Sequence, residues 1–295
     1  MISSIKNDRV YIRVSSLGAE LTSLKTVKDG FEYLWQPDPK FWARQAPTLF
    51  PLVGSVEDGR YRVGDEEYEL GIHGFAKDTD FRLTDESSDS LTYVTESNPE
   101  TLKSYPYRFT LQVRIKLEKD GVSTEYAVRN TDSRTIYFSI GGHPGFRCPW
   151  EEGLAMEDYA LLFEKAETLE RLLHDGGLRT GKTEPFLKGE KRVPLSHRLF
   201  DRGAVILEGF KSGHVVLGSD RSDRQVRFEF PGFPYLGIWS AKGEAPFVCI
   251  EPWFGIASAR GGKKDLREKE GMNALDPGGT FECGYRIAVE DSTNV

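Results

Sequence analysis

Two histidines and one glutamate lie in short stretches that are unlike ordinary strands or turns. His143 lies between glycines and a proline in GGHPGF (141–146), and His73 opens HGFAKD (73–78). Glu251 directly follows the apolar run Phe247–Ile250. A carboxylate at the end of a buried strand is costly unless it is paired or used. General acid–base catalysis suits these residues, because histidine titrates near neutral pH and burial can raise the pKa of a glutamate. Their usual pKa values of about 6.5 and 4.3 bracket a working range just below neutral pH, and an adjacent carboxylate would raise the pKa of a histidine.

Cationic and aromatic residues accompany these three. Arg44 is the one cation in FWARQAPTLFPLVG (41–54), and Lys77 lies in HGFAKD. Each has an ordinary alternative role, which is an ion pair at the edge of the core for Arg44 and a solvated surface charge for Lys77. Trp239 and Trp253 could simply fill the core, yet aromatic rings beside polar groups also suit the C–H faces of a sugar ring. The residues alone therefore indicate a sugar-binding β-protein with a candidate histidine–glutamate pair.

The pattern of potential metal ligands does not predict a metal centre. Two histidines and a glutamate could bind a metal by residue type, but the chain has no HxH or HExxH spacing. Three widely spaced cysteines form neither a disulfide framework nor a CxxC pair. We expect His174 and His197 to be loop residues without a role, and His214 to begin a short apolar strand. No metal and no cofactor are expected.

Alternating strands must position these side chains. Residues 107–117 alternate apolar and polar side chains, and Asp120-Gly121 between two such runs predicts a hairpin. Strands are also expected at 10–14, 136–140, 214–217, 225–230, 247–250 and 281–289. Helix signals are few: Asn98 could cap a short helix that ends near Ser104, and the charged run 263–270 reads as a solvated loop or short helix. Asp/Gly turns recur along the chain, so we predict one large twisted antiparallel β-sandwich with few short helices, as a single domain over residues 1–295.

Charge and hydropathy argue against nucleic acid and membranes as partners. The 46 acidic and 39 basic residues give a net charge of -7, so no basic field attracts nucleic acid. No run approaches the roughly 20 apolar residues of a membrane span. The first residues, MISSIKNDRV, lack the apolar region of a signal peptide. We expect a cytoplasmic protein, as a monomer or homodimer, whose partner is a small sugar or sugar phosphate.

Taken together and in order, FPLVG, HGFAKD, YPYRF, GGHPGF and EPWFG resemble the aldose 1-epimerase (galactose mutarotase-like) superfamily, and most of all its LacX-like subgroup. The resemblance covers nearly the whole chain and implies a large twisted antiparallel β-sandwich. By this resemblance Glu251 is the general base that takes the proton of the anomeric hydroxyl, and His143 protonates the ring oxygen. His73 then holds the sugar near the ring oxygen, and Arg44 contacts the substrate. Ring opening, rotation about C1–C2 and re-closure would convert one anomer into the other.

The resemblance leaves the substrate open between a free hexose and a hexose 6-phosphate. Family members that act on free galactose share a GYDH-type segment whose aspartate holds sugar hydroxyls, and this chain lacks that segment; Asp201 lies in about the same region but matches poorly. HGFAK is similar to the HGFAR stretch of the hexose-6-phosphate epimerase branch. Lys77 and Arg44 would then face a phosphate. Trp253 completes the expected substrate-binding residues.

Two other classes of protein compete with an epimerase. A non-catalytic sugar-binding or sensing protein on the same fold would bind sugar without turnover, and it would not need three acid–base groups. A glycosidase or lyase would be the third alternative, but a glycosidase needs two carboxylates flanking the scissile bond and only Glu251 stands out.

Overall fold

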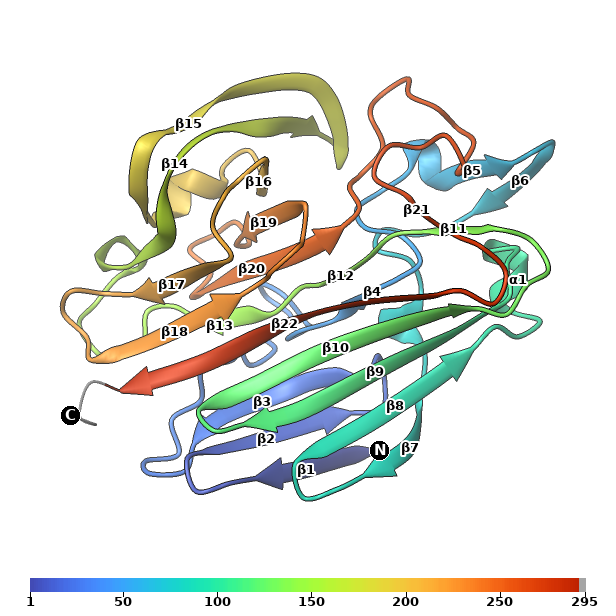
Figure 1. Cartoon of the computed structure of the whole chain (residues 1–295). Coiled ribbons are helices and arrows are strands. Elements are labelled where there is room, and N and C mark those ends of the chain that lie inside the picture. Colours follow the sequence, from blue (N-terminus) through green and yellow to red (C-terminus); the bar gives the residue numbers. More distant parts are fainter. Residues whose placement is uncertain (292–295) are drawn as a thin grey trace.

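The computed structural model describes residues 1–291, and most of them lie in antiparallel strands (Figure 1). Within these residues one sheet of 15 strands follows the order β4-β12-β20-β19-β16-β14-β17-β18-β22-β10-β9-β8-β7, with β13 paired to β20 and β15 paired to β14. A three-stranded sheet β1-β2-β3, the hairpin β5-β6 and the antiparallel pair β11-β21, whose strands are distant in sequence, complete the fold. The expected antiparallel β-sandwich is confirmed.

The strands of the first half are β1 (Ile2–Lys6), β2 (Val10–Ser15), β3 (Glu20–Thr26), β4 (Thr48–Leu49), β5 (Arg60–Val63), β6 (Glu66–Glu69), β7 (Arg82–Glu86), β8 (Ser90–Glu96), β9 (Phe109–Glu118), β10 (Gly121–Asn130), β11 (Ile136–Phe138), β12 (Ile140–Gly142) and β13 (Gly145–Arg147). Those of the second half are β14 (Ala160–Asp175), β15 (Leu178–Pro194), β16 (Val205–Glu208), β17 (His214–Gly218), β18 (Arg224–Glu229), β19 (Tyr235–Trp239), β20 (Phe247–Phe254), β21 (Asn273–Leu275) and β22 (Thr280–Asp291).

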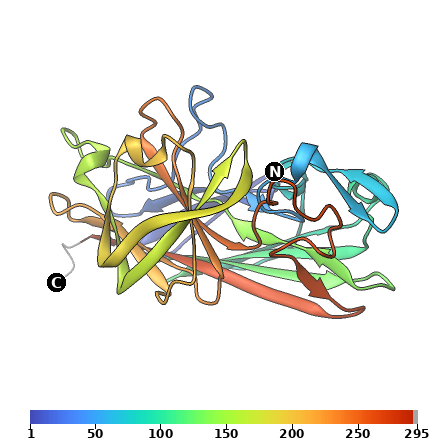
Figure 2. The same cartoon turned by 90° about the horizontal axis from the view of Figure 1, so that it is seen from above.

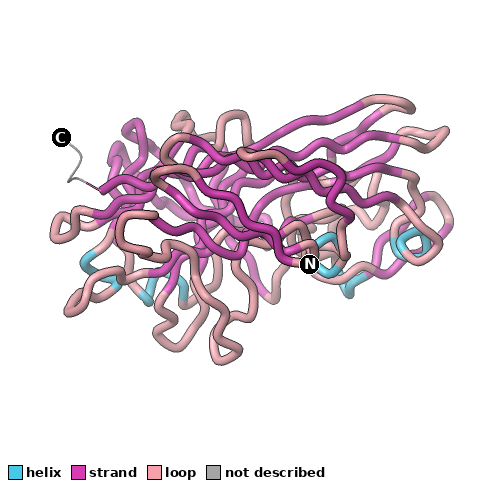
Figure 3. The backbone as a smooth tube through the Cα atoms, turned by 90° about the horizontal axis from the view of Figure 1, so that it is seen from below, coloured by secondary structure: helices cyan, strands magenta, loops and turns pink. Residues whose placement is uncertain are grey.

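Helical segments are short and peripheral, as Figure 3 shows from below in cyan. They are the helix α1 (Thr101–Ser104) and single turns of 3₁₀ helix at Glu57–Gly59, Ala76–Asp78, Met156–Asp158 and His197–Phe200. Asn98 accepts hydrogen bonds from the backbone N–H groups of Glu100 and Thr101 with its side-chain oxygen, as an N-cap residue does. No helix in the described part of the chain has the length and apolar character needed to cross a membrane.

The strand predictions hold where side chains alternate. β9 buries every second residue, and the turn at Asp120-Gly121 joins it to β10 in a regular antiparallel register. Apolar side chains of β1–β3 and of β8–β10 belong to one buried cluster, which also reaches β14, β17, β18 and β22. The small sheet and the large sheet therefore enclose a shared core.

The structure corrects two expectations, on the place of Glu251 and on the charged run 263–270. Glu251 does not follow a buried strand but lies inside one, because β20 continues to Phe254 and is paired with β19 on one edge and with β12 and β13 on the other. The charged run 263–270 contains no helix, and it is not wholly solvated, since Lys269 is only 6% exposed.

A long hairpin that the sequence did not predict rises above the rest of the fold. It consists of β14 and β15, drawn in yellow-green and yellow at the top of Figure 1 and seen from above in Figure 2. The pairing of β14 and β15 contains several register shifts, so the hairpin bends. Its tip and the neighbouring β16 form one wall of the cavity described next.

Candidate active site

A cavity of about 440 Å³ gathers the residues that the sequence singled out, and its size is typical of a site for a small molecule. Its lining is mostly apolar. All six expected site residues line it: Arg44, His73, Lys77, His143, Glu251 and Trp253. They come from four separate segments of the chain, so only the fold brings them together.

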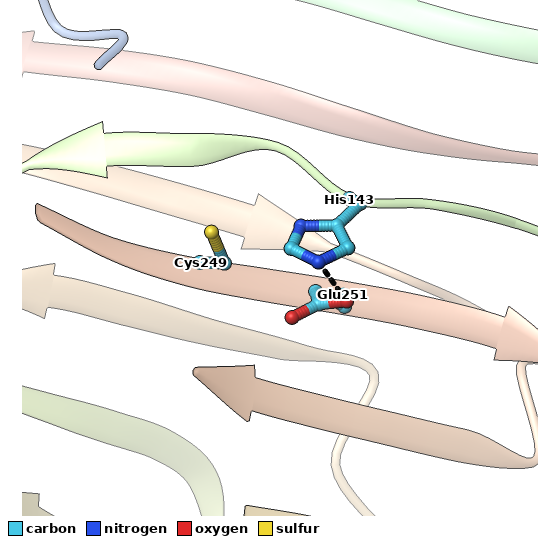
Figure 4. A group of neighbouring side chains, drawn as sticks. All are labelled: His143, Cys249 and Glu251. Atoms are coloured by element: carbon cyan, nitrogen blue, oxygen red, sulfur yellow. Dashed lines mark ion pairs between the residues drawn. The ribbon is translucent and has the colours of Figure 1, made fainter. Parts of the chain in front are cut away.

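At the base of the cavity, His143 and Glu251 are in direct contact. The Nε2 atom of His143 lies 3.0 Å from Oε2 of Glu251, and the two residues are 8% and 1% exposed. β12 pairs with β20 at Gly141 and β13 pairs with it at Gly145, so His143 lies in the short link between two pairings with the strand that carries Glu251 (Figure 4). The geometry of this pair is therefore set by the register of β20.

The glycines of GGHPGF make room for neighbouring protein atoms, which fill the space beside them. A Cβ on Gly141 would lie 2.6 Å from the carbonyl oxygen of Pro252, and one on Gly145 would lie 2.9 Å from the ring of Trp42. These glycines are needed for the close packing of β12, β13 and β20 around the histidine–glutamate pair.

Burial shifts both members of the pair toward their neutral forms. It raises the pKa of Glu251 well above the usual value and lowers the pKa of His143 well below it, and nearby His73 lowers the latter further. The expectation that the adjacent carboxylate raises the histidine pKa is wrong here, because the loss of water outweighs the attraction. Together the two side chains hold one proton, either as carboxylic acid and imidazole or as carboxylate and imidazolium.

His73 is locked in one orientation by the backbone of Gly54. Its own N–H donates to the carbonyl of Gly54 at 2.9 Å, and the N–H of Gly54 donates to Nδ1 of His73 at 3.1 Å. Nδ1 is thus an acceptor, so the proton of the neutral ring lies on Nε2. Burial, and next the charge of Lys77, lowers the pKa of His73 to about 3. His73 is therefore a neutral hydrogen-bond donor, and its ring meets that of His143 edge-on at 5.6 Å between centroids.

Three tryptophans lie around the histidine–glutamate pair. The sequence analysis considered Trp239 and Trp253 but not Trp42. Trp42 stacks on His143 with ring centroids 4.8 Å apart, while Trp239 meets the same ring edge-on at 5.5 Å. Trp253 packs so closely on β19 that a Cβ on Gly237 would lie 2.5 Å from its ring. Trp42 was overlooked although it lies two residues before Arg44, because a lone tryptophan in an apolar stretch is ordinarily a core residue.

The two cations of the cavity already have partners. Arg44 forms an ion pair with Asp78 and donates to the carbonyl of Lys77 at 2.7 Å, with Glu20 at 3.9 Å. Lys77 donates to the carbonyl of Gly74 at 2.6 Å and lies 2.9 Å from Asp78. The ordinary alternative for Arg44, an ion pair, is therefore present. The side chain of Lys77, only 18% exposed, is not the solvated charge of its alternative.

Cys249 is a further neighbour that the sequence analysis left without a role. It lies two residues before Glu251 on the same face of β20, and Figure 4 shows both side chains beside His143. Ligand atoms of His143, Cys249 and Glu251 lie within 4.8 Å of one another, which is a donor set that could hold a soft divalent metal. Burial raises the pKa of the Cys249 thiol well above its usual value, so a metal would have to displace protons from both the thiol and Glu251.

His174 also lines the cavity, although we expected a loop residue without a role. It lies near the end of β14, next to the Asp-Gly-Gly turn, and this turn was the only signal of its place in the sequence. Asp201, the poor match to the family's sugar-binding aspartate, is exposed and lies outside the cavity lining. His197 and His214 do not line the cavity, and His214 begins β17 as expected.

Comparison with known proteins agrees with the resemblance that the sequence motifs indicated. The family model for aldose 1-epimerase matches residues 1–260. The chain is 35% identical to the chromosomal protein LacX of Lactococcus lactis subsp. lactis, over 98% of this chain and 99% of that protein. Among solved structures, a galactose mutarotase related enzyme from Lactobacillus acidophilus is 32% identical with a TM-score of 0.96, covering 100% of this chain and 99% of that one. A galactose mutarotase-like protein from Lactobacillus casei is 34% identical with a TM-score of 0.93, covering 98% and 100%.

Proposed function

Because the chain belongs to the aldose 1-epimerase family, we propose that it interconverts the α and β anomers of an aldose by general acid–base catalysis. The observation that carries the proposal is the contact of 3.0 Å between His143 and Glu251 at the base of a cavity of sugar size. The reaction needs one base and one acid at the same carbon, and this pair holds the single proton that both roles require.

The proton count closes over the catalytic cycle. Glu251 as carboxylate takes the proton of the anomeric hydroxyl, while His143 as imidazolium gives its proton to the ring oxygen. The C1–O5 bond breaks, and C1 becomes an aldehyde. After rotation about C1–C2, imidazole takes the proton of the C5 hydroxyl as O5 attacks C1, and the carboxylic acid protonates the carbonyl oxygen. The pair returns to its first state, and no net proton, metal or cofactor is consumed.

His73 and the tryptophans have supporting roles in this proposal. The Nε2–H of neutral His73 donates to the sugar near the ring oxygen, and its low pKa keeps it from exchanging protons with His143. Trp42 stacks on His143, and the face of an aromatic ring stabilises an adjacent cation, so it favours the imidazolium form. Trp239 and Trp253 offer apolar faces to the C–H groups of the sugar.

The charge balance favours an uncharged sugar over a sugar 6-phosphate. Arg44 and Lys77 share Asp78, and Glu20 lies close to Arg44, so their charges are already offset. A phosphate near them would have to compete with these carboxylates and would be repelled by Asp78. We therefore propose a free aldose as the substrate, bound without a metal in one domain that spans residues 1–295.

The test is polarimetry of freshly dissolved anomers across paired sugars, free and 6-phosphorylated, with purified protein. The proposal predicts faster interconversion of at least one free hexose, with kcat/KM above that of its 6-phosphate. Higher kcat/KM for the phosphate would overturn the choice of substrate. Saturable sugar binding with no acceleration on any sugar would favour the non-catalytic alternative instead. A glycosidase is disfavoured because Glu251 is the only carboxylate among the described residues that line the cavity.

A further inference from the structure

One wall of the cavity carries a single polar side chain. It is formed by the tip of the β14–β15 hairpin and by the start of β16. Among the described residues, its members that line the cavity are His174, Gly177, Gly203, Ala204 and Ile206. A sugar is covered with hydroxyl groups, and a hydroxyl that leaves water without a new hydrogen-bond partner weakens binding. On this wall only the imidazole of His174 can supply such a partner with its side chain.

A backbone carbonyl fixes which ring nitrogen of His174 is the hydrogen-bond donor. Its Nε2 atom lies 2.9 Å from the carbonyl oxygen of Ala204. A carbonyl oxygen only accepts hydrogen bonds, so Nε2 must carry a proton. In the neutral imidazole Nδ1 is then an acceptor, and it has no hydrogen-bond partner among residues 1–291. Nδ1 is not buried, so a ligand in the cavity can reach it.

Gly203 and the pairing of β14 with β16 hold the imidazole ring of His174 in place. Gly203 lies directly under it with φ +89°, and a Cβ there would overlap Cε1 of the ring. β14 pairs with β16 at Arg171 and Leu172, so the contact of His174 with Ala204 continues this ladder toward the hairpin tip. The next residue, Asp175, forms an ion pair of 2.9 Å with Arg260. The imidazole is thus positioned as a rigid acceptor.

We infer that His174 is a specificity-determining residue, which accepts a hydrogen bond from one sugar hydroxyl remote from the anomeric centre through Nδ1. This inference rests on the proposed function, because it takes the ligand to be an aldose whose C1 lies against Glu251 and His143. It assigns recognition of the substrate to the β14–β16 wall, where no aspartate of residues 1–291 lines the cavity.

The test measures kcat/KM for a good substrate and for its single-deoxy analogues, each lacking one hydroxyl away from C1, by polarimetry. In the wild-type protein, removal of the hydroxyl that His174 recognises lowers kcat/KM by about 10-fold, the value of one hydrogen bond. In His174→Ala that ratio falls to about one, while the ratios for the other hydroxyls persist. His174→Gln retains a donor and an acceptor and restores part of the discrimination. His214→Ala, outside the cavity lining, keeps the wild-type pattern.

A second pair of variants moves the ring without removing it. Gly203→Ala places a methyl group where the imidazole lies, whereas Gly232→Ala imposes similar backbone strain at φ +79° with nothing within 4 Å. We expect Gly203→Ala to lose the same discrimination as His174→Ala, and Gly232→Ala to retain it.

The outcomes separate the two proposals. If the wild-type protein accelerates anomer interconversion but His174→Ala leaves every deoxy ratio unchanged, the inference on His174 is overturned and the epimerase proposal stands. If the wild-type protein accelerates no sugar, the proposed function itself fails.

Discussion

Nε2 of His143 and Oε2 of Glu251 lie 3.0 Å apart in a site where burial disfavours a charge on either side chain. Adding a second proton would leave a buried cation, and removing the shared proton would leave a buried anion. The one-proton state is therefore the stable state of the pair. That state contains both the acid and the base that the proposed reaction needs, because the proton can lie on either atom.

This relationship predicts a broad plateau of activity around neutral pH. The alkaline limit is the loss of the shared proton, which the raised pKa of Glu251 opposes, and the acid limit is the gain of a second proton, which the lowered pKa of His143 opposes. We expect kcat/KM at pH 8 to lie within about threefold of its value at pH 6.5. A free imidazole of pKa about 6.5 would be only about 3% protonated at pH 8. A tenfold fall per pH unit between pH 7 and 9 would show that His143 titrates alone.

Removing the aromatic face above His143 should reduce turnover more than binding. Trp42→Leu keeps an apolar side chain but loses the ring that stabilises the imidazolium, and this effect is worth about 0.5–2 kcal/mol, or roughly 2- to 30-fold in kcat. Trp42→Phe keeps an aromatic face and should retain most of the activity. Steady-state kinetics separate the two effects, and a rise in KM with unchanged kcat in Trp42→Leu would mean that Trp42 only contacts sugar.

Buried Lys269 should make stability depend on pH. Its Nζ donates to the carbonyls of Ile256 and Glu270, and burial, followed by the charge of Arg179, lowers its pKa from 10.5 to about 7. The unfolded chain binds this proton below pH 10.5 and the folded chain only below about 7, so the free energy of unfolding rises with pH across that interval. The slope is at most about 1.4 kcal/mol per pH unit.

Urea denaturation at pH 7.5, 8.5 and 9.5 measures this slope. Lys269→Met removes the titrating group and should flatten the dependence, whereas exposed Lys264→Met should keep it. Equal slopes in the wild type and in Lys269→Met would contradict the assignment.

Chelation should leave the activity unchanged, because the proposed cycle consists of proton transfers only. Dialysis against EDTA is expected to preserve kcat. Cys249→Ser is expected to retain kcat within about threefold, since the neutral thiol takes no part in the cycle. If chelation abolished the activity and added Zn²⁺ restored it, His143, Cys249 and Glu251 would have to be reconsidered as a metal centre.

Local sequence patterns predicted the fold better than they predicted the surroundings of the site. Strict alternation in residues 107–117 and the turn at Asp120-Gly121 identify the β9–β10 hairpin, because each depends only on neighbouring residues. β14 and β15 were missed because their exposed, charged residues and register shifts interrupt the alternation.

The candidate site was predicted in its residues but not in its environment. Motifs pointed to His143 and Glu251, yet the contact between these side chains depends on the pairing of β12 and β13 with β20. β20 lies about 100 residues after β12 and β13 in the sequence. The apolar run before Glu251 pointed to burial and so to its raised pKa, but the burial that lowers the pKa of His143 follows from packing that no local pattern encodes. Trp42 and His174 were overlooked for the same reason, because their place in the cavity follows from packing between distant segments.

The central claim is that Glu251 moves the proton of the anomeric hydroxyl. The most direct measurement compares wild-type protein and Glu251→Gln in polarimetric assays of anomer interconversion, with sugar binding followed by calorimetry. Glutamine has nearly the same shape but cannot act as a base, so we expect kcat to fall by at least about 100-fold while the Kd for sugar changes little. Interconversion by Glu251→Gln at the wild-type rate would contradict the account.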